Sequence, residues 1–278
     1  MTVDTVRAGR SEHRLATALE TSPRVASEPE VTLGGFPYFR HAQDGRFPGL
    51  TITARGIRAA GPPDLRGVPT TCDTTPCWAE LGVRADEVRG LADWRSRAPL
   101  TMRRVTASAK LDSVNLGRML DITDLSVNTP APADRAGGGG PGDGLLERSS
   151  GVLLTGTVTV PPMRPNPRTD GLYPPSAKDR FIVKPDTGQP VRVSVVVDLS
   201  VVDGQLNIAA TDFYRGPEEH ARGEVPPEIR QAVLQRFSGR VPYPRLPWGV
   251  VPTIANSAGS DVLISGKAAV LTATPDQF

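Results

Sequence analysis

Hydrophobic and polar residues alternate one by one along many short stretches of this chain, which is the period of a β-strand. The most regular stretch is 191–202, and the Asp203-Gly204 pair after it predicts a tight hairpin turn into a second strand at 206–214. The same alternation predicts further strands at 30–34, 50–60, 78–88, 97–111, 151–160, a stretch that begins at 246–251, and 262–272. Antiparallel strands therefore account for most of the predicted structure.

Other stretches repeat their apolar residues at the helical period instead. Residues 2–21 form one such stretch, which Pro23 ends. Asp112-Ser113 is a helix N-cap signal ahead of a short amphipathic stretch. Pro226-Pro227 starts a further helix that runs to about residue 237. Because strands cluster and helices flank them, the fold class is α+β.

Residues 29–50 have the most unusual local composition in the chain. A strand is broken by Gly34-Gly35, and Phe36-Pro37-Tyr38-Phe39 follows, in a chain that is only 5% aromatic. We call residues 34–39 the aromatic corner. The residue pattern alone predicts a hydrophobic plug that closes one end of a β core.

The chain has 278 residues, 28 glycines and 28 prolines, which allows one large, loop-rich domain. The Gly/Pro-rich stretch 130–144 is either a boundary or a flexible excursion. We favour an insertion within a single domain, 1–278, because strands are predicted on both sides of it. No run of about 18 apolar residues occurs, and the N-terminus lacks a signal-peptide core.

Charge and cysteine content exclude several kinds of site. The net charge of +2 is spread along the chain and gives no support for nucleic-acid binding. Cys72 and Cys77 are expected to form a short-loop disulfide, which fits an oxidising compartment, and a pair of free thiols is the alternative. No metal site is expected, because the histidines are remote from both cysteines in sequence. No cofactor is expected either, since Gly137–Gly140 lacks the Gly-Lys-Ser/Thr of a phosphate loop.

The chain contains no recognisable catalytic motif, neither Gly-x-Ser-x-Gly nor His-Glu-x-x-His. His13 falls in the amphipathic N-terminal helix, His41 beside the aromatic corner and His220 in a charged loop. Surface histidines are expected at such positions rather than general bases. We therefore expect a binding protein and not an enzyme.

Two segments, EVTLGGFPYF at 30–39 and GRFPGLTITARG at 45–56, resemble the opening of the LmeA-like family of mycobacterial and other actinobacterial cell-envelope proteins. The resemblance implies a periplasmic phospholipid-binding protein that supports mannan elongation of lipomannan and lipoarabinomannan. It implies an elongated, tubular (BPI-like or TULIP-like) architecture, in which a long curved antiparallel sheet wraps around one or more helices. It also implies an N-terminal membrane or signal segment ahead of residue 1. We expect a monomer.

Such a protein would hold acyl chains in an apolar cavity that removes them from water. The candidate lining residues are apolar side chains of the corner, the strands and the helices: Leu33, Phe36, Phe39, Ile52, Met102, Leu116, Met119, Leu120, Val195, Val197, Phe213 and Phe237. Plain core packing is the alternative for each of them. Arg40, Arg46 and Arg55, near the corner, are candidate contacts for the lipid headgroup.

The expected ligand is a phospholipid, such as phosphatidylinositol, or a mannolipid. A membrane surface and an envelope mannosyltransferase are the further partners expected. One alternative is an enzyme acting on a glycolipid or a polyprenyl-linked sugar, which would need acidic side chains gathered in one pocket. The other is a scaffold for an envelope glycosyltransferase, which would expose an apolar patch and hold no lipid.

Overall fold

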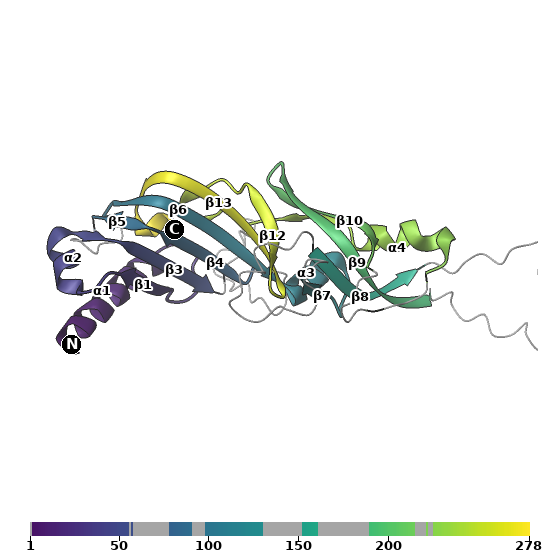
Figure 1. The fold of residues 1–278 in the computed structure, drawn as a ribbon, viewed down its shortest axis with the longest axis horizontal. Coiled ribbons are helices and arrows are strands. Elements are labelled where there is room, and N and C mark those ends of the chain that lie inside the picture. The colour runs from purple at the N-terminus through teal and green to yellow at the C-terminus, as the bar shows by residue number, and fades with distance from the viewer. Residues whose placement is uncertain are drawn as a thin grey trace, which may run out of the picture.

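The computed structural model describes residues 2–55, 57, 78–90, 98–129, 152–160, 189–214, 221 and 225–278. These residues form antiparallel strands in two sheets together with four α-helices, so the predicted α+β class is confirmed. The two sheets follow one another along the longest axis of the molecule (Figure 1). The predicted insertion at 130–144 and the pair Cys72 and Cys77 lie outside the described residues.

The first sheet has eight strands, in the order β1-β3-β4-β6-β13-β12, with β5 also paired to β6 and β2 paired to β5. The strand bounds are β1 Glu30–Gly34, β2 Arg46–Phe47, β3 Gly49–Arg55, β4 Glu80–Ala85, β5 Glu87–Arg89, β6 Leu100–Asp112, β12 Ile254–Ala258 and β13 Asp261–Ala273. All of these pairs are antiparallel. The long β6–β13 pair forms the middle of the sheet and ties the C-terminal hairpin to the middle of the chain.

The second sheet has five strands in the order β11-β10-β9-β8-β7. The bounds are β7 Ser126–Asn128, β8 Val152–Val160, β9 Gln189–Val202, β10 Gln205–Phe213 and β11 Gly239–Pro242. The predicted hairpin is confirmed: Asp203 and Gly204 join β9 to β10 with φ values of 49° and 74°. Positive φ at both central residues is the geometry of a type I′ turn, which Gly204 adopts without steric cost.

Helices lie at both ends of the molecule and between the sheets (Figure 1). The α-helices are α1 Thr2–Glu20, α2 Tyr38–Asp44, α3 Ser113–Leu120 and α4 Arg230–Arg236, and the short 3₁₀ helices are η6 Pro227–Ile229, η7 Pro247–Gly249 and η8 Pro275–Gln277. Helix α1 packs against β1, α2 and η8. Helix α3 starts directly after β6, where the Asp112 side chain accepts the Asn115 backbone N–H at 2.8 Å, as the N-cap signal predicts.

An irregularity in β6 at Arg104 changes which residues face inward. Leu100 and Met102 are buried on one side of it and Val105 on the other, so the buried set moves from even to odd positions at Arg104. Arg104 has a φ of 47°. The residue opposite is also skipped, since Val105 pairs with Ala268 and Arg103 with Val270. One residue is skipped on each strand, so the register is unchanged, and Arg103 is exposed beside Arg104.

Buried apolar side chains from both sheets form one continuous cluster. It joins Ile52 and Met102 of the first sheet to Val195 and Phe237 at the second. Partly buried apolar residues around this cluster concentrate on the second sheet and its helices: Met119, Leu120, Val191, Leu199, Val201, Ala210, Phe213, Val225, Ile229 and Leu234. The interior is therefore less completely covered near α3 and α4 than in the first sheet.

The structure corrects several expectations. The strands divide between two sheets rather than forming one long sheet, because β6 ends at the Asp112 cap and the chain leaves the first sheet there. The strand expected at 78–88 is broken at Asp86, whose carboxylate accepts a hydrogen bond from Arg104 at the irregular position of β6. The strand expected to begin at 246–251 is wrong, since η7 occupies this stretch and Trp248 has a φ of 53°. Helix α2 and strands β2, β7 and β11 were not predicted.

Candidate functional site

The aromatic corner leads into α2, whose first turn is held by a side chain from α1. The backbone N–H groups of Tyr38 and Phe39 donate to the two carboxylate oxygens of Asp4, at 2.7 and 3.0 Å. The first N–H groups of a helix have no partner within the helix, and a carboxylate there is also favoured by the helix dipole. Asp4 therefore fixes α2 against α1.

The aromatic side chains of the corner divide between the interior and the surface. Tyr38 is buried, its ring centroid lies 5.3 Å from that of Phe47, and its hydroxyl donates to Ser11. Phe36 and Phe39 point outward, with 75% and 42% of their surfaces exposed. The predicted hydrophobic plug is thus formed by Tyr38 and Phe47, while Phe36 and Phe39 remain at the surface.

The candidate headgroup arginines differ in what they already bind. Arg46 donates to Glu87 at 2.7 Å, and Arg55 lies 3.5 Å from Glu80. Arg40 is exposed and has no hydrogen bond or ion pair among the described residues. Arg40 is therefore the candidate that is available to a ligand without breaking an existing ion pair.

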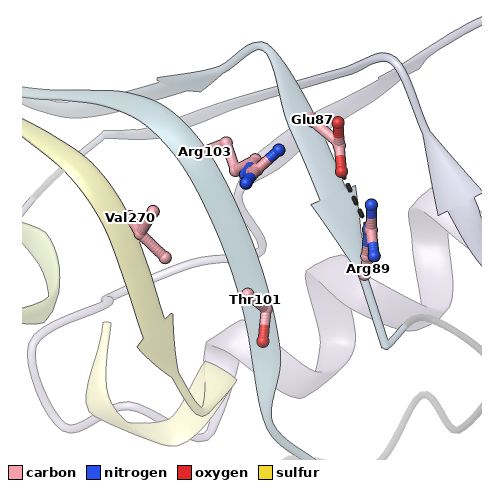
Figure 2. Close-up of a pocket in the computed structure, with 5 residues that line it drawn as sticks. All are labelled: Glu87, Arg89, Thr101, Arg103 and Val270. Atoms are coloured by element: carbon pink, nitrogen blue, oxygen red, sulfur yellow. Dashed lines mark hydrogen bonds and ion pairs between the residues drawn. The ribbon is translucent and has the colours of Figure 1, made fainter.

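A shallow hollow of about 190 Å³ lies on the outer face of the first sheet, where β5, β6 and β13 run side by side (Figure 2). Its lining residues are Glu87, Arg89, Thr101, Arg103 and Val270. The strand register explains this grouping, because Arg103 pairs with Glu87 on one side and with Val270 on the other. Directly opposed residues on neighbouring strands lie about 5 Å apart.

The hollow carries an excess of positive charge. Glu87 accepts hydrogen bonds from Arg46 and Arg89 at 2.7 and 2.8 Å, and these bonds hold its pKa below the usual value, with the Arg46 bond the larger cause. Glu87 is therefore ionised at neutral pH. Arg103 extends from β6 toward Glu87 and Arg89 (Figure 2), and it has no hydrogen bond or ion pair among the described residues.

This arrangement can accept a small anionic group but not acyl chains. A guanidinium with free N–H groups is the usual donor for phosphate and carboxylate oxygens. The volume of about 190 Å³ lies below the roughly 300–1,000 Å³ of pockets that enclose whole ligands. None of the five lining residues was predicted from the sequence. Their only signal there was the slip in β6 alternation between Met102 and Val105.

The match to a known family covers nearly the whole chain. The family described as LmeA-like phospholipid-binding matches residues 2–267. The chain belongs to this family. The resemblance inferred from the corner motif is therefore confirmed. Comparisons with curated proteins and with solved structures gave no match.

Most apolar residues proposed to bind lipid in this LmeA-like chain lie in the core cluster. Those that are buried are Leu33, Ile52, Met102, Leu116, Val195, Val197 and Phe237. Burial is equally compatible with core packing and with the wall of an interior cavity, so their lipid contact stays a prediction. Met119, Leu120 and Phe213 are only partly buried and pack against the cluster near α3 and α4. The Arg230 guanidinium lies 4.9 Å from the centroid of the Phe213 ring.

The histidines, possible metal ligands and possible membrane spans of the LmeA-like chain were also considered from the sequence. His13 pairs with Glu28 at the surface, and His41 lies 3.2 Å from the Arg46 carbonyl oxygen. His220 lies outside the described residues. Within the described ranges, no three His, Cys, Asp or Glu side chains gather as metal ligands. No helix in the described part of the chain is long and apolar enough to cross a bilayer.

Proposed function

We propose that this protein binds a phospholipid and holds its acyl chains against the apolar interior near α3 and α4. The observation that carries the proposal is the match of residues 2–267 to a phospholipid-binding family. In this proposal the chain acts as a binding protein and not as an enzyme.

The distribution of burial supports this location for the acyl chains. Met119, Leu120 and Phe213 adjoin the core cluster but keep part of their surface exposed. A lipid chain that covers such side chains removes apolar surface from water at about 25 cal/mol per Å². Met119 also suits an irregular ligand, because its flexible thioether side chain adapts its shape.

The wider role follows from the family resemblance. We infer that the protein works in the periplasm or cell envelope, as a monomer with an elongated BPI-like shape. There it supports mannan elongation of lipomannan and lipoarabinomannan, beside an envelope mannosyltransferase and a membrane surface. The bound lipid is phosphatidylinositol or a mannolipid.

Native mass spectrometry of the purified full chain, followed by lipid extraction, tests the proposal. We expect one phospholipid per chain, and we expect Met119→Asp and Phe213→Asp to lose it. Val202→Asp is the matched control, because Val202 is an exposed apolar residue at the tip of the β9–β10 hairpin, 46% exposed. A lipid-free mass that stays unchanged after incubation with phosphatidylinositol vesicles would contradict lipid binding and favour the scaffold function.

A further inference from the structure

Helices α1 and α2 lie at one end of the molecule (Figure 1). Apolar and basic side chains are exposed on these two helices and on the corner between β1 and α2. We define this docking face by Val6, Arg7, Arg10, Phe36, Phe39 and Arg40. Val6, Arg7 and Arg10 lie on the first turns of α1, and Phe39 and Arg40 lie on α2. Asp4 joins the two helices there, since it caps α2 from α1.

The apolar part of the docking face is held rigidly outward. Phe36 is 75% exposed, and Phe39 and Val6 are also exposed. The Phe39 backbone is bonded to Asp4, and its neighbour Tyr38 is anchored in the core against Phe47. Single exposed apolar residues are common, but Phe36 and Phe39 are both exposed within one short corner, and such a grouping points to an interaction site.

On α1, two acidic side chains face the fold and two basic side chains face solvent. The acidic residues Asp4 and Glu12 of α1 face the fold, where they accept the backbone N–H groups of α2 and of Leu33. Arg7 and Arg10 face solvent, and they have no hydrogen bond or ion pair among the described residues.

On α2, one exposed basic residue and one exposed acidic residue balance each other in charge. Arg40 is exposed and has no described partner, and Asp44 is an exposed acid at the other end of the helix. With Arg7 and Arg10 of α1, this end exposes three arginines without a described partner and one acid, Asp44, while the carboxylates of Asp4 and Glu12 are turned toward the fold. The exposed charges are therefore mainly positive, which favours contact with a negative surface.

We propose that this face docks the protein onto a membrane that contains anionic phospholipid. Phe36 and Phe39 enter the interface, and Arg7, Arg10 and Arg40 contact headgroup phosphates. A lipid bilayer matches both properties at once, because its anionic headgroups overlie an apolar layer. The inference rests on the proposed function, since a protein that takes up phospholipid must meet a membrane to exchange it.

Cosedimentation of the full chain with vesicles tests this. Vesicles of phosphatidylcholine with phosphatidylglycerol are compared with vesicles of phosphatidylcholine alone. We expect binding to the anionic vesicles, weakened by raising the salt from about 0.1 M to 1 M. Phe36→Asp should weaken binding at least about tenfold. The double variant Arg7→Gln with Arg10→Gln should weaken it about fivefold for each arginine.

Matched controls separate the docking face from general surface effects. Val251→Asp is the control for Phe36→Asp, because Val251 is 72% exposed in another part of the chain. Arg84→Gln with Arg240→Gln is the control for the arginine pair, since both are exposed and also lack partners among the described residues. All variants should keep the wild-type melting temperature. The control variants should bind vesicles as the wild type does, and the docking-face variants should show the losses given above.

The results distinguish docking from lipid holding. Phe36→Asp that loses vesicle binding but keeps its co-purified lipid supports docking at this face. Failure of the wild-type chain to bind anionic vesicles, or equal losses in the control variants, would overturn it. If no lipid co-purifies but vesicle binding still depends on Phe36, lipid holding fails and docking stands.

Discussion

Gly266 in the middle of β13 is expected to be the glycine least able to accept a side chain in the described sheets. A Cβ built on Gly266 would lie 2.0 Å from the Val251 carbonyl oxygen, 2.8 Å from its carbonyl carbon and 3.1 Å from the Pro252 Cα. All three atoms belong to the backbone of the segment that crosses β13 on its way from η7 to β12.

Neither side of this contact can move away easily. β13 is paired along its whole length with β6 and along its first half with β12. The crossing segment is held by a hydrogen bond from the Thr253 N–H to the Ser265 carbonyl at 2.8 Å, and by the Trp248 indole, which donates to the Thr274 carbonyl at 2.9 Å. Overpacking of this kind costs about 3 kcal/mol, the upper part of its usual range.

Gly266→Ala should therefore destabilise the protein by about 2 kcal/mol. The clash of about 3 kcal/mol is offset by roughly 0.4–1 kcal/mol, because alanine lowers the conformational entropy of the unfolded chain. For a chain of this size, we expect a melting temperature about 4–8 °C lower.

Gly9→Ala is the matched control. Gly9 lies in the middle of α1 and a Cβ there meets nothing within 4 Å, so the change should stabilise by up to about 1 kcal/mol. Thermal melts and urea unfolding of both variants give the comparison. If Gly266→Ala melts at or above the wild-type temperature, the segment does not cross β13 at this distance and the reasoning is wrong.

Three further predictions concern other parts of the described structure. Phe47→Ala, at a fully buried position against Tyr38, should cost about 3–5 kcal/mol in urea unfolding, whereas Phe36→Ala at the exposed corner should stay within about 0.5 kcal/mol. Asp112→Ala removes the α3 cap and should cost about 1 kcal/mol, while Asp112→Asn keeps an acceptor and should cost clearly less; equal losses would contradict the cap. Burial alone would raise the pKa of Asp124, but two hydrogen bonds from Thr157 and the nearby Arg192 hold that pKa below its usual value. This carboxylate therefore stabilises the fold above about pH 4 and stops doing so as the pH falls through its lowered pKa, so Asp124→Asn should flatten the stability curve in that acid range.

The parts of the fold that the sequence predicts are those determined by nearby residues. Asp203-Gly204 sets the β9–β10 turn by its own backbone preference, and Asp112 caps α3 from the adjacent position. Helix α2 was missed because its cap, Asp4, lies 34 positions away in the chain. The 3₁₀ turn at Trp248 was missed for the same reason, since the residues that hold the indole, Thr274 and Phe278, come from the C-terminus.

The candidate sites also differ in whether neighbouring or distant residues in the sequence form them. The aromatic corner was visible because its residues are contiguous, but the sequence did not show that Tyr38 packs against Phe47 while Phe36 stays exposed. The hollow joins Arg89, Arg103 and Val270 from three strands, and only the register brings them together. The alternation along β6 carries one local sign of the hollow, the change of phase between Met102 and Val105 at Arg104, whose φ is positive.

Burial explains why the apolar candidates could not be sorted from sequence. A strand residue such as Val195 faces the interior whether the space opposite is filled by side chains or by a lipid chain, because both environments remove the same apolar surface from water. What differs is the completeness of cover, and this varies between the two sheets: the partly buried residues Met119, Phe213 and Leu234 lie at the second. The first sheet, next to the docking face, is tightly packed and is expected to be the more rigid of the two. The second sheet, at the other end, is less completely covered and can adapt more easily. The proposed membrane docking therefore uses the more completely covered end, and the proposed acyl-chain site uses the end where apolar side chains remain partly exposed.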